Sequence, residues 1–262
     1  MAWFFADSVS IPTHTITGED AVHITKSLRM KPGEQLTVCD SDGIRHDCVI
    51  ESISGGTVDV RVTESYKCEN EPKTFVTLYQ ALAKGDKMDF IIQKAVELGV
   101  KEIVPVLTDR CVSRPDEKSM KKKLERWNKI ALQAAQQSRR GTIPKVMPLM
   151  TLDNAAQRAG DTAVVCYELG GSPLGELTVS RKDKLSLFIG SEGGFEKSEI
   201  ETILSFGGEC ATLGSRILRA ETAPIAALSV IMYLTGNLGA SDTPQRHDNG
   251  EAPKGGDWSH IS

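Results

Sequence analysis

The sequence predicts an α/β protein in which a parallel sheet follows a smaller β-rich unit at the amino terminus. An apolar run, an amphipathic stretch and a second apolar run succeed one another between residues 75 and 107, as in a βαβ unit with parallel strands. Two later apolar runs, at 185–189 and 211–213, each stop at a glycine-bearing turn. Before residue 68 the chain has short, nearly alternating apolar runs separated by turn sequences, which is typical of hairpins.

Residues 1–70 are predicted to form a small barrel-like β domain. Strands are expected at Gln35–Cys39 and Thr57–Val62. Turn residues that suit hairpins lie between them, at 40–43 and 54–56. A helix is expected at Glu19–Leu28, ended by a Lys-Pro-Gly sequence.

A polar, proline-bearing join at 69–73 sets the domain boundary, so the second domain spans 74–238. It opens with a strand over Phe75–Leu82, a helix over Lys87–Leu98 and a strand over Glu102–Leu107. The helix places apolar side chains on one face and stops at Gly99.

The stretch 110–145 is strongly basic, with eleven Lys and Arg against three Asp and Glu, while the whole chain has a net charge of -4. Apolar residues recur at helical spacing from Leu124 to Ala134, so a helix with one buried stripe and one basic face is expected. A solvated face is the ordinary interpretation of such a charge run. The contrast with the acidic remainder favours a phosphate-binding surface.

The two glycine turns, 190–194 and 214–216, are predicted to frame one small-molecule pocket, because glycine lets the backbone approach a ligand closely. The turn after the strand at 163–167 supplies Glu168 as a third wall. Taken singly, each turn is also an ordinary strand-to-helix connection. The first turn lacks the G-x-G-x-x-G pattern of dinucleotide sites, and its carboxylate suits a cationic ligand better than a pyrophosphate.

Two more helices are expected near the end of the second domain. Ser198 and Glu201 match a capping box at the start of one helix. The last helix, within 223–238, is apolar nearly all round and is expected to be buried.

The sequences of the two glycine segments, Gly190–Phe195 and Leu213–Ala223, resemble the signature segments of the knotted SPOUT methyltransferases, and more narrowly those of the RsmE family. That family methylates N3 of a uridine in 16S ribosomal RNA of the small ribosomal subunit. The resemblance implies a carboxyl-terminal trefoil-knot domain that binds S-adenosyl-L-methionine, a PUA-like RNA-binding domain before it, and a homodimer formed through the last helix.

Several site residues follow from the resemblance together with the pocket. The cofactor is expected to contact Glu168, Ile189, Gly190, Glu192, Gly193, Gly194, Leu213, Gly214, Ile217, Leu218 and Ala223. Candidate catalytic residues are Arg139 and Arg219, as cations that support the uridine anion, and Glu192 and Glu221, which orient the base or take its proton. RNA is expected to contact His23, Lys26, Arg29, Lys121, Lys122 and Arg140.

Composition and cysteine spacing exclude some other classes. Six cysteines without any C-x-x-C pair argue against a zinc ribbon and a disulfide scaffold, and no metal is expected. With no signal peptide and no membrane span, the protein is expected in the cytoplasm. Residues 239–262 read as a flexible tail.

Two other functions stay open from the sequence. One is a SPOUT methyltransferase that modifies a ribose 2′-hydroxyl of ribosomal or transfer RNA. The other is a non-enzymatic RNA-binding assembly factor that has kept the fold.

Overall fold

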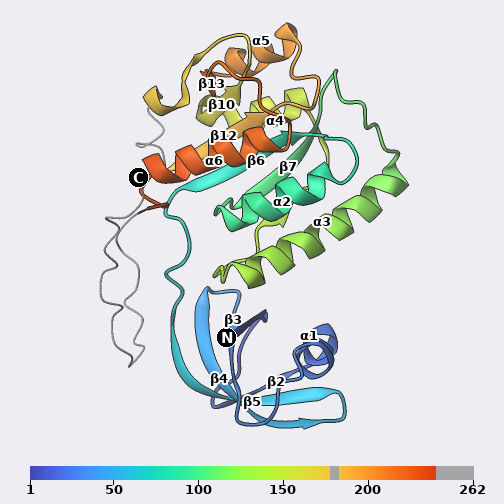
Figure 1. Cartoon of the computed structure of the whole chain (residues 1–262), viewed down its shortest axis with the longest axis vertical. Coiled ribbons are helices and arrows are strands. Elements are labelled where there is room, and N and C mark those ends of the chain that lie inside the picture. Colours follow the sequence, from blue (N-terminus) through green and yellow to red (C-terminus); the bar gives the residue numbers. More distant parts are fainter. Residues whose placement is uncertain (178–182, 240–262) are drawn as a thin grey trace, which may run out of the picture.

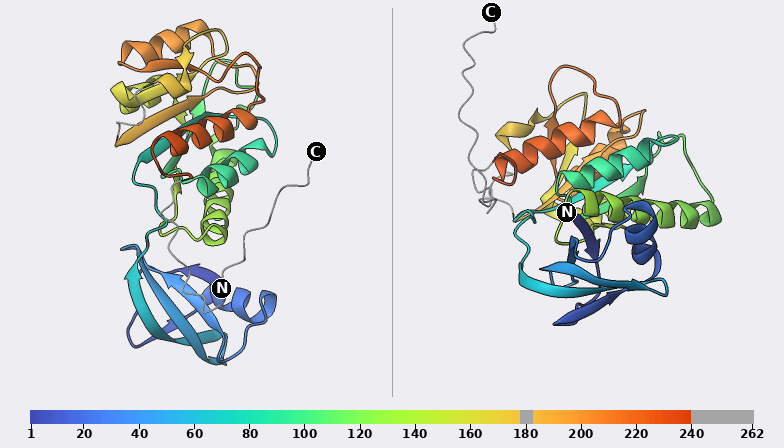
Figure 2. Two further views of the ribbon diagram at one scale, coloured as in Figure 1. Left: turned by 60° about the vertical axis from the view of Figure 1, so that its left-hand side comes forward. Right: turned by 60° about the horizontal axis from the view of Figure 1, so that its bottom comes forward.

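The structure, a computed structural model, describes residues 1–177 and 183–239. The expected tail at 239–262 lies outside the described residues except for Gly239. Two units follow one another, a smaller one at the amino terminus and a larger one that carries most of the helices (Figures 1 and 2).

The smaller unit is a five-stranded sheet with the order β1-β3-β4-β5-β2. Its strands are β1 (Ala2–Phe5), β2 (Thr13–Ile16), β3 (Gln35–Cys39), β4 (Ile44–Ser54) and β5 (Thr57–Lys67). β1 runs parallel to β3 and the other pairs are antiparallel. Both predicted hairpin turns are confirmed, since they join β3 to β4 and β4 to β5.

A short helix covers one side of this sheet. α1 (Gly18–Val22) continues directly into a π-helical turn, η1 (His23–Ser27), so the predicted helix is confirmed but changes its hydrogen-bonding pattern midway. Ala21 and Ile24 point into a core that includes Phe4, Leu36 and Val60. His23, Lys26 and Ser27 of the same turn stay exposed, and Thr25 is half-buried.

The larger unit is built on a parallel sheet of eight strands within the described residues, with the path β11-β13-β10-β12-β6-β7-β8 and with β9 also paired to β7. The strands are β6 (Phe75–Ala81), β7 (Glu102–Leu107), β8 (Lys145–Val146), β9 (Met150–Thr151), β10 (Ala163–Cys166), β11 (Ser172–Pro173), β12 (Lys184–Ile189) and β13 (Glu209–Thr212). The predicted parallel α/β class is therefore confirmed.

Helices cover both faces of this sheet. One apolar core joins it to α2 (Lys87–Glu97), α3 (Glu117–Gln137) and α6 (Thr222–Leu234). A second core, on the other face, joins it to α4 (Leu152–Ala159) and α5 (Lys197–Ser205). Short 3-10 turns lie at Gly160–Thr162 and Leu174–Glu176. The result is a three-layer arrangement (Figure 1).

Two local predictions were wrong. The capping box of α5 is formed by Glu196 and Glu199, not by Ser198 and Glu201, because the helix begins one residue before Ser198. α6 is not buried all round: Ile231 is inaccessible, whereas Tyr233 is 67% exposed. An apolar composition conceals this division, because every face of the helix reads alike in the sequence.

The six cysteines are free, and four of them are buried. Cys39 donates a hydrogen bond to the carbonyl of Gly141, 3.3 Å away, and so links the first sheet to the segment after α3. None of the helices in the described part of the chain is long and apolar enough to cross a membrane.

Candidate active site

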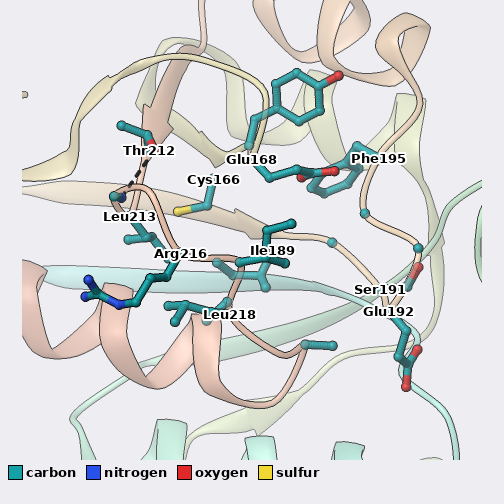
Figure 3. Close-up of a pocket in the computed structure, with 18 of the residues that line it drawn as sticks. Cys166, Glu168, Ile189, Ser191, Glu192, Phe195, Thr212, Leu213, Arg216 and Leu218 are labelled. Carbon is teal, nitrogen blue, oxygen red and sulfur yellow. Dashed lines mark hydrogen bonds between the residues drawn. The ribbon is translucent and has the colours of Figure 1, made fainter.

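Glycine residues and carboxylate side chains gather where three neighbouring strands end. β13, β10 and β12 are adjacent in the sheet, so the loops that follow their carboxyl ends meet at one edge. Ligands bind at this edge in open parallel sheets. The loops and the start of α6 enclose a cavity of about 320 Å³, within the size range of small-ligand sites (Figure 3).

The loop after β12 is held tightly against its surroundings. Gly194 donates a backbone hydrogen bond to the carbonyl of Ser191 at 3.0 Å and has a φ of +70°, which favours glycine. A Cβ atom on Gly194 would lie 2.6 Å from a carboxylate oxygen of Glu168. The conformation therefore favours glycine here, and a larger residue would also displace the Glu168 carboxylate from its position beside the loop.

Two side chains from other parts of the chain hold the loop after β12 in place. Gln80, fully buried on β6, donates a hydrogen bond from its side-chain nitrogen to the carbonyl of Gly190 at 3.3 Å. Arg110 donates to the carbonyl of Gly193 at 2.9 Å and forms an ion pair with Glu196. The cavity wall is thus preorganised by residues far apart in sequence.

The loop after β13 is open toward the cavity. Gly214 has a φ of +99°, and its N–H donates to the hydroxyl of Thr212 at 3.3 Å (Figure 3). No heavy atom lies within 4 Å of where its Cβ would stand. Here glycine is required by the backbone conformation alone, and the space beside it is free for a ligand.

An ion-paired cluster connects the first glycine loop to the start of α6. The ammonium of Lys87, at the beginning of α2, lies 3.1 Å from a carboxylate oxygen of Glu192 and 3.1 Å from one of Glu221. The backbone N–H of Lys84 also donates to Glu192, at 3.0 Å. Three distant segments are held together by these contacts.

The cluster determines the charge of its members. Hydrogen bonds to Glu192 and Glu221 raise the pKa of Lys87. Burial opposes ionisation of Glu192, but the Lys84 N–H and the Lys87 ammonium outweigh it and lower the pKa of Glu192. The backbone N–H of Glu221 and the Lys87 ammonium lower the pKa of Glu221. All three groups are therefore charged at neutral pH, which makes either carboxylate a weak proton acceptor.

The structure brings all of the residues expected around a cofactor to this one cavity. Its lining includes Glu168, Ile189, Gly190, Glu192, Gly193, Gly194, Leu213, Gly214, Ile217, Leu218 and Ala223. Sequence reasoning missed further lining residues, among them Cys166, Tyr167, Ser191, Phe195, Thr212 and Ala220. Most of them are sequence neighbours of predicted positions in the same loops, and this adjacency is the signal by which they could have been found.

The candidate catalytic residues divide into two groups. Arg219 is exposed and lines a smaller cavity together with Glu192, and Glu221 is linked to Glu192 through Lys87. Arg139 follows the end of α3, is exposed, and does not line either cavity. Lys87 was missed as a site residue, because the sequence shows it only as the first residue of a helix.

The candidate RNA-binding residues, Arg140 apart, lie on α3 and on or just after η1, and none of them lines either cavity. His23, Lys26 and Arg29 are exposed on or just after η1, and Lys121 and Lys122 are exposed on α3. α1 lies beside α3, with a Glu19 carboxylate 3.8 Å from the ammonium of Lys129.

Arg140 does not belong to that surface, and its prediction as an RNA contact was wrong. Its side chain is 3% exposed. It pairs with Glu71 and donates to the carbonyls of Val96 and Val100 at 2.8 and 3.0 Å. All of its charge is used inside the protein, so a position in a basic stretch misled the sequence analysis.

No group of three or more His, Cys, Asp or Glu side chains that could hold a metal ion occurs within residues 1–177 and 183–239.

Comparison with known proteins gives consistent matches along the chain. Residues 69–232 match the model of an RNA methyltransferase domain, and residues 16–63 match that of an RNA methyltransferase PUA domain. Ribosomal RNA small subunit methyltransferase E of Bacillus subtilis is 39% identical over 86% of this chain and 91% of its own length. The protein with the same name in Mycobacterium tuberculosis is 30% identical over 86% and 88%.

Solved structures agree with these matches. A ribosomal RNA small subunit methyltransferase E from Neisseria gonorrhoeae, bound to S-adenosyl methionine, is 30% identical with a TM-score of 0.81 and covers 89% of this chain and 98% of its own. A putative methyltransferase from Legionella pneumophila, in complex with the cofactor SAM, is 31% identical with a TM-score of 0.81 and covers 88% and 96%.

Proposed function

Since the chain belongs to the RsmE family of RNA methyltransferases, we propose that it transfers a methyl group from S-adenosyl-L-methionine to N3 of a uridine in 16S ribosomal RNA. The observation that carries this proposal is the cavity in which both glycine loops and Glu168 converge. Relatives of nearly the same length carry the name ribosomal RNA small subunit methyltransferase E.

The residues around the cavity fit the cofactor. Ile189, Leu213 and Leu218 offer apolar walls to an adenine ring, and the open space beside Gly214 lets the backbone lie against it. Glu168 and Glu192 supply negative charge for a cationic sulfonium. The Ser191 hydroxyl is buried and has no hydrogen-bond partner within the described residues, so it is free to bind a ligand.

When bound, the cofactor supplies an electrophilic methyl group, and the protein supplies position and charge. Gln80 and Arg110 fix the first glycine loop, and this loop in turn positions the ligand. Arg219, beside Glu192, is a cation available to the uridine anion. Because Glu192 and Glu221 stay ionised, we assign them to holding charge and geometry rather than to removing the proton from N3.

The RNA must present an unpaired base, because N3 lies on the Watson–Crick edge. Residues 1–70 are proposed as the RNA-binding PUA-like domain and residues 74–238 as the methyltransferase domain, an assignment supported by the two family matches. His23, Lys26, Arg29, Lys121 and Lys122 are exposed and are proposed to contact phosphates. Arg139, exposed at the end of α3, is proposed to act on RNA rather than on the cofactor of its own chain.

A trefoil knot and a homodimer complete the proposal. The loops between β12 and α6, which carry the cavity, are the segments proposed to form the knot. Support for a dimer comes from apolar side chains that the single chain leaves exposed, namely Ile217 at 85%, which lines the cavity, and Tyr233 at 67%, near the carboxyl end of α6. In a dimer the amino-terminal domain of one subunit could present RNA to the cofactor of the other. The protein is proposed to work in the cytoplasm, where ribosomal subunits assemble.

The test is methylation of small ribosomal subunits and of free 16S RNA from a strain that lacks the protein. Nuclease digestion and mass spectrometry should find a base-methylated uridine in one of the two substrates. A 2′-O-methylated ribose would assign the protein to a different class of SPOUT methyltransferase. Binding of RNA without any methylation, and without cofactor binding by calorimetry, would assign it to the non-enzymatic assembly factors.

A further inference from the structure

A second, smaller cavity adjoins the one proposed for the cofactor. It measures about 300 Å³ and shares part of its wall with the larger cavity. Its lining includes Lys87, Ser191, Glu192, Leu218, Arg219 and Ala220. Since Ser191, Glu192, Leu218 and Ala220 line both cavities, a group in the smaller one lies next to a ligand in the larger one.

The smaller cavity is polar and close to neutral in charge. Lys87 and Arg219 line it as cations, and Glu192 lines it as an anion. Glu221 does not line the cavity but pairs with Lys87. The other acidic side chains near the start of α2, Asp86 and Asp89, are turned to Arg126 on α3. The two cations and the two carboxylates near the cavity therefore balance.

Ser191 provides an independent sign of a ligand. Its residue is 6% exposed, and its hydroxyl oxygen has no hydrogen-bond partner within the described residues. Leaving a buried hydroxyl unpaired is energetically unfavourable, so such groups are usually satisfied by a ligand or by water. This hydroxyl borders both cavities.

We propose that the smaller cavity receives the pyrimidine base to be methylated, and that Lys87, with Ser191 and Arg219, contacts the two exocyclic oxygens that flank N3. This inference rests on the proposed function and names the substrate subsite of the same site. Uracil presents oxygen acceptors on both sides of N3, which suits a cavity with two cationic donors and a hydroxyl. Cytosine has an amino group in place of one of these oxygens and fits it less well.

The charge balance predicts that the base ionises more readily when the cofactor is in place. With an empty larger cavity the four side chains sum to zero. A bound sulfonium adds one positive charge, which the anion formed at N3 then neutralises. The proton from N3 goes to solvent water. The N3 electron pair then forms the new N–C bond as the S–C bond breaks, and the sulfonium becomes a neutral thioether.

The first experiment compares the single-turnover methylation rates of Lys87→Met, Lys87→Arg and Lys94→Met at saturating S-adenosylmethionine, on the RNA substrate of the wild type. Lys94 is the matched control because it lies on the same helix, is equally exposed and pairs with Glu97 away from both cavities. Lys87→Met should slow methyl transfer about 100-fold. The pH at which its rate rises should also be about one unit higher than in the wild type, because the base anion has lost a neighbouring cation.

Lys87→Arg should restore most of the rate and the pH profile, and Lys94→Met should leave both unchanged. A Lys87→Met enzyme with an unaltered rate and pH profile would overturn the inference while leaving the proposed function intact. If Lys87→Met weakens binding of S-adenosylmethionine as strongly as it slows transfer, and the pH profile is unmoved, Lys87 only positions the loops.

A second experiment measures binding of the base independently of methyl transfer. Calorimetry would compare uridine 5′-monophosphate with its 5-fluoro analogue, whose N3 is more acidic, in protein saturated with the unreactive cationic analogue sinefungin. The wild type should favour the fluoro compound, and Lys87→Met should lose that preference. Equal affinities in the wild type would overturn the inference whether or not the protein methylates RNA.

Discussion

The Arg140 guanidinium and the Glu71 carboxylate form a two-point ion pair, with Nε to Oε1 and Nη2 to Oε2 both at 2.8 Å. Glu71 lies in the join between the two units, and Arg140 follows α3. Glu71 also accepts the N–H of Gly141 at 2.9 Å and pairs with Lys101. One largely buried carboxylate thus ties the join to two segments of the larger unit.

Breaking this pair should destabilise the protein strongly. Arg140→Met leaves the largely buried Glu71 charge without its main partner and with Lys101 alone as a cation, which costs up to about 3–5 kcal/mol in the free energy of unfolding. Arg139→Met removes an exposed arginine at the next position and should change it by about 0.5 kcal/mol or less. Urea unfolding of the two variants measures the difference. Equal stabilities would mean that Arg140 is not the partner on which Glu71 depends.

The same pair predicts a pH dependence. Burial opposes ionisation of Glu71, but the hydrogen bonds and charges of Arg140 and Lys101 prevail and lower the pKa of Glu71 from 4.5 to about 2. A depressed carboxyl pKa stabilises the fold above the unfolded value, so this contribution should be lost as the pH falls from 4.5 toward about 2. Glu71→Gln should be less stable at neutral pH and should show a flatter acid limb. Thermal unfolding across that range checks it, and an unchanged acid limb would assign acid sensitivity elsewhere.

Much of the fold was predictable because its signals are local. The strands at β3, β7 and β12 and the helix α2 follow from apolar runs and spacing within one window of sequence. The glycine loops were predictable for the same reason, since positive φ at Gly194 and Gly214 is a requirement of the loop itself.

The parts that were missed depend on long-range partners. Lys87 acquires its role from Glu192 and Glu221, both more than one hundred positions away. Arg140 was placed on the RNA surface because nothing near it in sequence shows the pairing with Glu71. A charge run predicts the sign of a surface but not which of its members are turned inward.

The cofactor cavity gives a third prediction. Gly194→Val should weaken binding of S-adenosylmethionine, because a side chain there meets Glu168 and cannot adopt a φ of +70° without strain. Gly214→Val is strained by its φ of +99° alone. Restoring each loop on binding should cost about 1–3 kcal/mol, which corresponds to about 5- to 150-fold in affinity.

Calorimetry measures this effect, and circular dichroism should find both variants folded. Gly175→Ala is the control, since Gly175 has no positive φ and free space around it. Unchanged affinity in both valine variants would remove the glycine loops from the binding site.

A fourth prediction concerns the basic face of α3. Replacing Lys121 and Lys122 with Glu should weaken RNA binding and reduce the slope of log affinity against log salt by about 0.7 for each lost contact to single-stranded RNA. Lys123 is left in place because its ammonium lies over the Trp127 ring, 5.9 Å from the centroid, and its removal would disturb the helix packing.

The matched control reverses Lys73 and Lys184, two exposed lysines just before or at the start of β6 and β12, at the opposite end of the sheet from the cavity. It changes the net charge equally and should leave the salt slope unaltered. If both pairs change the slope alike, the effect is one of overall charge and α3 carries no specific phosphate surface.

The last prediction concerns assembly, where the structure separates two residues that the sequence treats alike. Ile231 is inaccessible within one chain, so Ile231→Asp would unfold the core whatever the oligomeric state. Tyr233, two positions on, is 67% exposed on α6. If α6 forms the dimer interface, Tyr233→Asp should lower the sedimentation coefficient from that of a dimer to that of a 28.5 kDa monomer without lowering the melting temperature of the monomer. Phe206→Asp, which adds the same charge at an exposed aromatic after α5 on the other face, should remain dimeric. A wild-type protein that sediments as a monomer at micromolar concentration and is fully active on RNA would refute the shared site, because each chain would then have to bind its RNA and its cofactor alone.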